Sequence, residues 1–133
     1  MTEESGAPVW LTPDLVKAIH ARQLRLFGGP PGIRDEGASE SALGRPINRW
    51  TYEQAGSGLP ELAAAYAFGI ARNHPFVDGN KRAALLALVT FLGLNGIDFA
   101  ADEAEAVVMI RGLAAGEVDE AGLTRWIRDN WPE

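Results

Sequence analysis

The residues with the clearest chemical potential lie together in the stretch 74–82, which reads HPFVDGNKR and precedes a long apolar run. His74 can exchange a proton near neutral pH, because an unperturbed imidazole has a pKa of about 6.5. Asp78 can hold a hard cation, while Lys81 offers a phosphate a point charge and Arg82 a planar, bidentate fork. This combination is typical of a site that binds a phosphate-bearing ligand and moves a proton.

The same stretch predicts a loop followed by a buried helix. Pro75 disfavours the α conformation at His74, and Gly79 after an aspartate is typical of a tight turn, because glycine readily takes a positive φ. Asn80 has the side chain of a helix N-cap. The following residues are almost all apolar, so we expect a core helix over about 81–94.

A helix that starts here would form an anion site. Its first backbone N–H groups have no internal partners and lie at the positive end of the helix dipole. Lys81 and Arg82 fall in the first turn, where each cation opposes the dipole by about 0.3–1 kcal/mol. A negative ligand would offset this cost, so we predict phosphate binding by Gly79, Asn80, Lys81 and Arg82.

The residue types favour phosphoryl-type transfer from a nucleotide to a hydroxyl. We predict that His74 takes the proton of the acceptor and that Asp78 holds Mg²⁺, because this ion needs few protein carboxylates and takes other oxygens from water and phosphates. Lys81 and Arg82 would position the phosphates and stabilise their charge. Phe76 is expected to pack beneath the loop. The loop chemistry alone leaves open whether a terminal phosphate or a nucleotidyl group is transferred.

Each of these residues also has an ordinary structural explanation when it is considered alone. His74 could be a hydrogen-bonded loop histidine, Asp78 a turn former, and the two cations solvated residues at a helix start. Their combination at this spacing favours a functional site. His20, by contrast, falls within the apolar stripe of another predicted helix, which is more typical of a packing residue, and we leave it out of the site.

The elements that must position this loop are predicted to be helices, in a compact all-α bundle of about five to seven helices around the 81–94 helix. No strand alternation of useful length occurs. Thr12 and Pro13 are typical of a helix start, and glycines and prolines after Phe27 of its end. The other predicted elements are a polar loop over 34–38, a short helix from Ser39 or Ser41 that ends before Gly44, a further turn over 47–50, an exposed turn-rich stretch over 51–58, and helices over about 60–73, 101–115 and from 119 onward.

Composition fits one domain, which we place at 12–133 after a loose lead-in over 1–11. The 133 residues are 47% hydrophobic and 23% charged, and there is no cysteine, which excludes disulfides, thiolate metal sites and cysteine nucleophiles. The net charge of −6 argues against general nucleic-acid binding. Residues 98–120 carry seven acidic side chains and one basic side chain, Arg111. No signal peptide or membrane-spanning run occurs, so we expect a cytoplasmic protein without a membrane partner.

Residues 74–82 resemble the signature loop of the Fic/Doc (fido) family. His74, Phe76, Asp78, Gly79 and Asn80 match the family pattern, and the Lys-Arg ending at 81–82 matches its death-on-curing (Doc) branch. The adenylylating Fic branch usually has glycine where this chain has a lysine and a second arginine where it has Leu85. The similarity extends over most of residues 10–98.

The resemblance implies a Doc-like toxin of a toxin–antitoxin pair. Such a protein would be a kinase that transfers the terminal phosphate of ATP to a serine or threonine hydroxyl of a translation elongation factor, elongation factor Tu, with Mg²⁺ present. Two alternatives remain. One is a Fic-like adenylyltransferase that transfers AMP to a protein hydroxyl, and the other is a catalytically silent fido domain that binds a protein partner.

Regulation in trans is also implied. Self-restraining Fic proteins carry a Ser/Thr-x-x-x-Glu-Gly/Asn motif, and no stretch here matches it. We therefore expect an antitoxin whose C-terminal segment binds as a helix in a groove on the toxin. The mildly basic region 17–49 is the candidate groove wall, with Leu24, Phe27, Ile47 and Trp50 as possible anchors, although core packing would explain the same residues.

Overall fold

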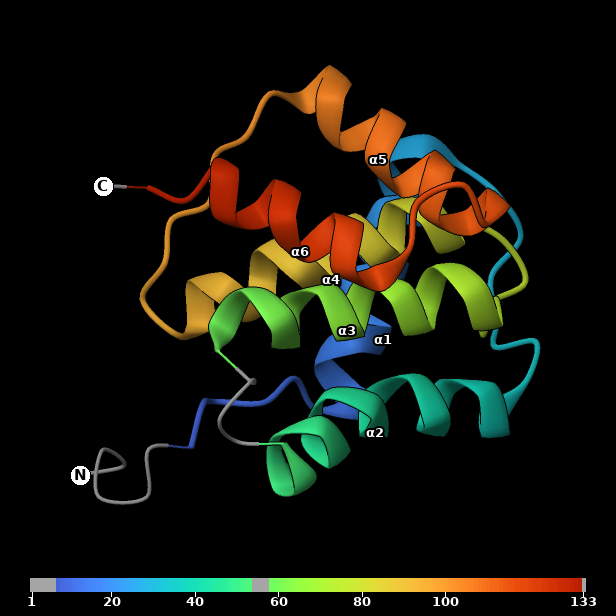
Figure 1. Ribbon diagram of the computed structural model, residues 1–133. Helices are drawn as coiled ribbons and strands as arrows, with labels where there is room; N and C mark the ends of the chain where they lie inside the picture. The colour runs from blue at the N-terminus through green and yellow to red at the C-terminus, as the bar shows by residue number, and fades with distance from the viewer. Residues whose placement is uncertain (1–6, 54–57, 133) are drawn as a thin grey trace.

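The computed structural model describes residues 7–53 and 58–132, and these residues fold into six α-helices (Figure 1). The helices are α1 (Pro13–Phe27), α2 (Glu36–Tyr52), α3 (Leu59–Asn73), α4 (Asn80–Leu94), α5 (Glu103–Ala115) and α6 (Glu120–Asp129). Within the described residues, the β structure is a single antiparallel bridge between Ile33 and Phe76. The predicted all-α bundle is therefore confirmed. The turn-rich stretch expected over 51–58 lies partly in α2 and partly outside the described residues.

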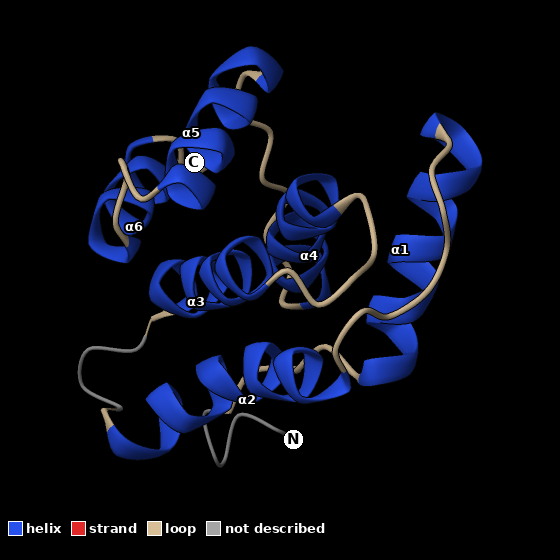
Figure 2. Ribbon diagram, turned by 90° about the vertical axis from the view of Figure 1, so that its right-hand side faces the viewer, coloured by secondary structure: helices blue, strands red, loops and turns tan. Residues whose placement is uncertain are grey.

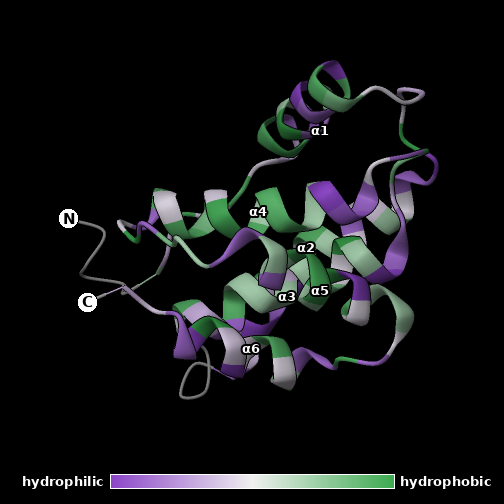
Figure 3. Cartoon of the chain, turned by 90° about the horizontal axis from the view of Figure 1, so that it is seen from above, coloured by the Kyte–Doolittle hydropathy of each residue, from purple (hydrophilic) through white to green (hydrophobic). Residues whose placement is uncertain are grey.

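Helices α3 and α4 form the centre of the molecule, with α1 and α2 on one side and α5 and α6 on the other (Figure 2). The predicted buried helix is α4, whose Ala83, Leu88 and Phe91 are almost fully buried. It shares the centre with α3, in which alanines at 63, 64, 65, 67 and 71 are buried. These small side chains let neighbouring helices approach α3 closely. Figure 3 shows the hydrophobic colour extending along α3 and α4, whereas α1 and α6 are of mixed colour.

Helix α2 corrects the sequence prediction for residues 34–50. One continuous helix replaces the expected loop, short helix and separate turn, because Asp35 caps it by accepting a hydrogen bond from the N–H of Ala38 at 3.1 Å. Pro46 lies inside the helix, where proline costs about 3 kcal/mol, and it is buried. Packing outweighs this cost. A Cβ built on Gly69 of α3 would lie only 3.0 Å from the Cα of Ala42, so the two helix backbones are in close contact.

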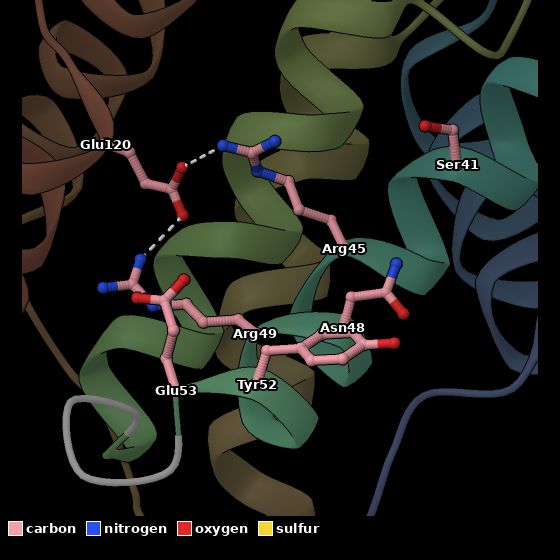
Figure 4. A pocket seen from close by; sticks show the side chains of 7 residues that line it. All are labelled: Ser41, Arg45, Asn48, Arg49, Tyr52, Glu53 and Glu120. Atoms are coloured by element: carbon pink, nitrogen blue, oxygen red, sulfur yellow. Dashed lines mark hydrogen bonds and ion pairs between the residues drawn. The ribbon is translucent and has the colours of Figure 1, made fainter.

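Ion pairs attach α6 to α2. The carboxylate of Glu120, the first residue of α6, accepts hydrogen bonds from Arg45 and from Nη1 of Arg49, the latter at 3.2 Å (Figure 4). The Arg45 guanidinium also lies 4.5 Å from the centroid of the Phe68 ring on α3. A cavity of about 360 Å³ at this place is lined by these two arginines together with Glu120 and Glu53. The two positive charges are therefore balanced by two negative charges.

Part of the predicted lead-in is anchored on the bundle. Leu11 is 3% exposed, and its N–H donates to the hydroxyl of Tyr66 at 3.0 Å. Val9 exchanges two hydrogen bonds with the side chain of Asn95, at 2.8 and 3.0 Å. The chain is therefore held from residue 9 onward, while residues 1–6 lie outside the described part. None of the described helices is long and apolar enough to cross a membrane.

The buried Tyr66 makes a prediction about stability at high pH. Burial raises the pKa of Tyr66 to about 12, and the hydrogen bond from Leu11 opposes that rise. Because the pKa is raised in the folded state, the stabilisation is complete below the unfolded pKa of about 10 and is lost as the pH rises toward about 12. We expect the free energy of unfolding of the wild type to fall over this range.

Tyr66→Phe should remove this contribution to the pH dependence and lower stability at neutral pH by about 1–3 kcal/mol, because it leaves the buried N–H of Leu11 without its acceptor. Urea denaturation at neutral pH and in the alkaline range measures both effects. Tyr52→Phe is the matched control, since Tyr52 is 82% exposed. An alkaline loss of stability that is equal in the wild type and in Tyr66→Phe would contradict the prediction.

Candidate active site

The loop over 74–79 joins α3 to α4 and begins with an unusual backbone conformation at His74. His74 ends α3 with φ 49° and ψ 58°, and it is the one non-glycine residue with a positive φ among the described residues. Arg34 holds this end of α3, donating from Nε to the carbonyl of His74 at 2.7 Å and from Nη2 to that of Asn73 at 2.8 Å. The left-handed conformation ends the helix and leaves the His74 side chain exposed.

The segment 32–35 pairs with the first half of the loop. The N–H groups of Arg34 and Asp35 both donate to the carbonyl of Pro75, at 2.7 and 3.2 Å, and the N–H of Val77 donates to the carbonyl of Gly32 at 3.1 Å. The bridge between Ile33 and Phe76 lies between these bonds. This pairing joins segments about forty positions apart, and the sequence, read as a polar loop from residue 34, gave no sign of it.

Asn80 has a different role from the predicted one. It is the first residue of α4, the N-cap is Gly79 with φ 77°, and no side chain caps the helix. The amide of Asn80 spans the loop instead: its Oδ1 accepts from the N–H of Phe76, and its Nδ2 donates to the carbonyl of Phe76, both at 2.9 Å. The N-cap prediction is therefore wrong. Because the cap position holds glycine, the first N–H groups of α4 remain open to a ligand.

One face of α1 supports the loop from below, through residues at helical spacing: His20, Gln23 and Phe27. The His20 ring is 5% exposed and stacks on Phe76, with centroids 3.8 Å apart and an interplanar angle of 7°. Its Nε2 lies 2.7 Å from the carbonyl oxygen of Asp78 and can donate to it. His20 is thus a packing residue, as predicted, but it packs on the candidate loop. Phe76 itself is 1% exposed.

The other two residues of this face reach the start of α4. Gln23 is fully buried beneath Gly79, so that a Cβ at position 79 would lie 1.9 Å from its Nε2. Phe27 lies under Arg82, whose guanidinium carbon is 4.3 Å from the ring centroid. Contacts between α1 and the loop were not predicted, because a lone helix pattern does not reveal what its inner face touches.

The loop, the start of α4 and α5 line one cavity of about 530 Å³. Its lining contains every predicted site residue except the buried Phe76: His74, Asp78, Gly79, Asn80, Lys81 and Arg82. Helix α5 adds Val107, Ile110 and Arg111, and α4 adds Leu85. Sequence reasoning missed Arg111 as a site residue. The available signal was a single basic residue within a strongly acidic stretch.

Asp78 lines this cavity, and its carboxylate contacts two glycines. Its Oδ1 accepts a hydrogen bond from the N–H of Gly79 at 2.8 Å, and its Oδ2 lies against Gly29, where a Cβ would approach it to 2.5 Å. No group of three or more histidine, aspartate or glutamate side chains in the described residues could hold a metal ion. One exposed carboxylate fits Mg²⁺ that takes its other ligands from phosphates and water.

Comparison with known proteins identifies the class. The model of the Fic/DOC family matches residues 10–92, and the chain belongs to this family. It is 34% identical over 118 residues to protein kinase doc of Escherichia phage P1, covering 89% of this chain and 92% of that protein. It is also 45% identical over 76 residues to toxin Doc of Mycolicibacterium smegmatis, covering 57% of this chain and 58% of that protein. The resemblance seen in residues 74–82 is confirmed.

The left-handed backbone at His74 generates a stability prediction. The left-handed conformation raises the free energy of a residue with a Cβ by about 1–2 kcal/mol, whereas glycine adopts it without this cost. We expect His74→Gly to be more stable than His74→Ala by about 1 kcal/mol in urea denaturation, after the extra backbone entropy of glycine in the unfolded chain is allowed for.

Arg72 provides the matched pair, because it lies in the last turn of the same helix. There Arg72→Gly should be less stable than Arg72→Ala by about 1 kcal/mol, the ordinary order for a helical position. The same order at position 74 would show that this residue does not hold the left-handed conformation in solution.

Proposed function

We propose that this protein is a Doc-like toxin that transfers the terminal phosphate of ATP to a serine or threonine hydroxyl of elongation factor Tu. The observation that carries the proposal is the cavity in which His74, Asp78, Lys81 and Arg82 surround the open N-terminus of α4. Kinship with protein kinase doc and toxin Doc supports the class of reaction and the toxin role.

The charges that line this cavity suit a polyphosphate. Lys81, Arg82 and Arg111 supply three cations against one carboxylate, that of Asp78. The first two extend from the helix turn whose N–H groups are open, and Arg111 comes from α5. A phosphate on the backbone between Gly79 and Arg82 would accept hydrogen bonds from those N–H groups and offset the repulsion between the cations and the helix dipole.

Transfer would need a base and charge neutralisation. His74 would accept the proton of the acceptor hydroxyl as the acceptor oxygen bonds to the terminal phosphorus and the bond to the bridging oxygen of ADP breaks. Asp78 would hold Mg²⁺, which when bound would neutralise phosphate charge. Asn80 would act mainly through the loop backbone that it bonds at Phe76.

AMP transfer is the rival reaction, because the same groups could act on the α-phosphorus of a nucleotide bound the other way round. The residues that favour terminal phosphate transfer are Lys81 and Leu85, both in the cavity lining, which occupy the places of the glycine and second arginine of adenylylating relatives. Incubation with elongation factor Tu and ATP labelled separately on the α and γ phosphates separates the two reactions.

We expect the γ label, and not the α label, to appear on the acceptor. His74→Ala should reduce transfer by at least about 10²-fold, as is typical for the loss of a general base. Asp78→Ala should reduce it as well, while Arg125→Gln, an exposed change outside the cavity lining, should leave it unchanged. Transfer of the α label would establish the adenylyltransferase, and failure to transfer either label would favour the silent binding domain.

The toxin role predicts an effect on growth that depends on the same site. Expression of the wild-type chain alone should arrest bacterial growth, and His74→Ala should not, because the base is lost. Co-expression of an antitoxin that binds in trans as a helix should restore growth. Phe27 and Ile47, two of the expected groove anchors, are 61% and 38% exposed, while Trp50 packs on the core. A harmless wild-type chain without any partner would contradict the toxin role.

A further inference from the structure

The last turn of α1 exposes two neighbouring apolar side chains, and one of them contacts a residue of the candidate site. Leu26 is 65% exposed and Phe27 is 61% exposed. The Phe27 ring lies beneath the guanidinium of Arg82, 4.3 Å from its centroid. An exposed aromatic ring at a helix end needs no explanation by itself, but this ring is the surface on which a cation of the candidate site rests.

The Phe27 ring lies on the same face of α1 that supports the loop. It continues the face of α1 that carries His20 and Gln23, which contact Phe76, Asp78 and Gly79. The position of Arg82 relative to the open start of α4 is therefore set from two sides, by its own helix and by the ring. Arginine stacks on aromatic faces through its planar, weakly hydrated guanidinium, and such stacking holds the plane while leaving the edge N–H groups free to bond.

We propose that Phe27 is a positioning residue for Arg82, which holds the guanidinium plane so that its fork meets a phosphate of the nucleotide in the cavity. The inference rests on the proposed function, because it assigns Arg82 a nucleotide phosphate. Phe27 does not touch the substrate. Its effect passes through the cation–π contact, and it lowers the cost of ordering a long side chain when the ligand binds.

The alternative role of Phe27 is that of an apolar anchor for a helical partner, which the sequence also allows. The two roles differ in what they require of the side chain. An anchor requires apolar bulk, so methionine or leucine would serve. A platform for a cation requires a ring face, so tyrosine would serve and leucine would not.

The test uses the full chain and ATP, with the dissociation constant measured by calorimetry and the steady-state kinetics measured on elongation factor Tu. Phe27→Leu and Phe27→Ala should each weaken ATP binding about 2- to 5-fold and raise KM for ATP similarly, with kcat little changed, because the contact acts on binding. Phe27→Tyr should bind ATP as tightly as the wild type does, because tyrosine keeps the ring face. Leu26→Ala is the matched control, equally exposed on the same turn, and should leave both constants unchanged.

A double-mutant cycle with Arg82→Gln decides whether the effect passes through Arg82. In that background Phe27→Leu should have no further effect on ATP binding. An effect that persists there, or that is equal in Phe27→Leu, Phe27→Tyr and Leu26→Ala, would overturn the inference. Circular dichroism on each variant separates unfolding from loss of binding.

The inference and the proposed function can fail separately in this design. If the wild type binds ATP but transfers nothing, the proposed reaction is wrong, while the pattern of dissociation constants still decides the role of Phe27. If the wild type transfers phosphate and Phe27→Leu binds ATP as tightly as the wild type does, the reaction stands and the positioning role is wrong.

Discussion

His20 joins α1 to the loop at 74–79 through two contacts, and the geometry of the candidate site depends on them. Its ring covers Phe76, and its Nε2 is bonded to the carbonyl oxygen of Asp78. The two stacked rings are buried and the hydrogen bond is partly buried, so water competes little with either contact. The loop is thereby held through its backbone and through Phe76. The side chains of His74 and Asp78 stay exposed, and these are the ones to which chemistry is assigned.

The first half of the loop is also held by the backbone pairing with residues 32–35, so both segments that support the loop precede it in the chain. The bonds that hold the loop are therefore made mainly to its backbone, and they leave the side chains of His74 and Lys81 unused. The side chains of Arg34 and Asn80 bond to backbone groups of the loop and of the end of α3. None of those bonds uses the imidazole of His74 or the ammonium of Lys81. The cations therefore remain available at the start of α4, where they oppose the helix dipole until an anion is present.

Much of the site could be predicted from the sequence because its residues lie close together in the chain. Residues 74–82 lie within one turn-and-helix unit, and the apolar run after them predicts α4 almost to the residue. Asn80 was misplaced by one position, since its side chain has the chemistry of a cap but is used for an equally local bond to Phe76. The prediction failed for α2, where glycine and proline signals were overridden by close packing on Gly69. Local propensity cannot foresee such a contact.

What the sequence did not reveal are the contacts that packing makes between residues distant in the chain. His20 and Phe27 look like ordinary members of a helix stripe, and Arg111 like a stray cation on an acidic helix, until the bundle brings them to the loop and its cavity. Their contacts span tens of residues, and a helical period shows which residues share a face but not which partner that face meets. The residue types of the loop indicated its chemistry, and the family resemblance indicated the reaction, whereas the contacts that support the loop became visible only in the fold.

Gly79 shows how closely support and site are linked. Its φ of 77° already favours glycine, and the amide of Gln23 fills the space that a side chain would need. A larger residue at position 79 would have to displace the buried amide of Gln23, which lies on the face of α1 that also carries His20 and Phe27. The same face of α1 contacts the carbonyl of Asp78 through His20 and the guanidinium of Arg82 through Phe27. Gly79 therefore lies where the turn of the loop packs on α1, on the same helix face that contacts Asp78 and Arg82.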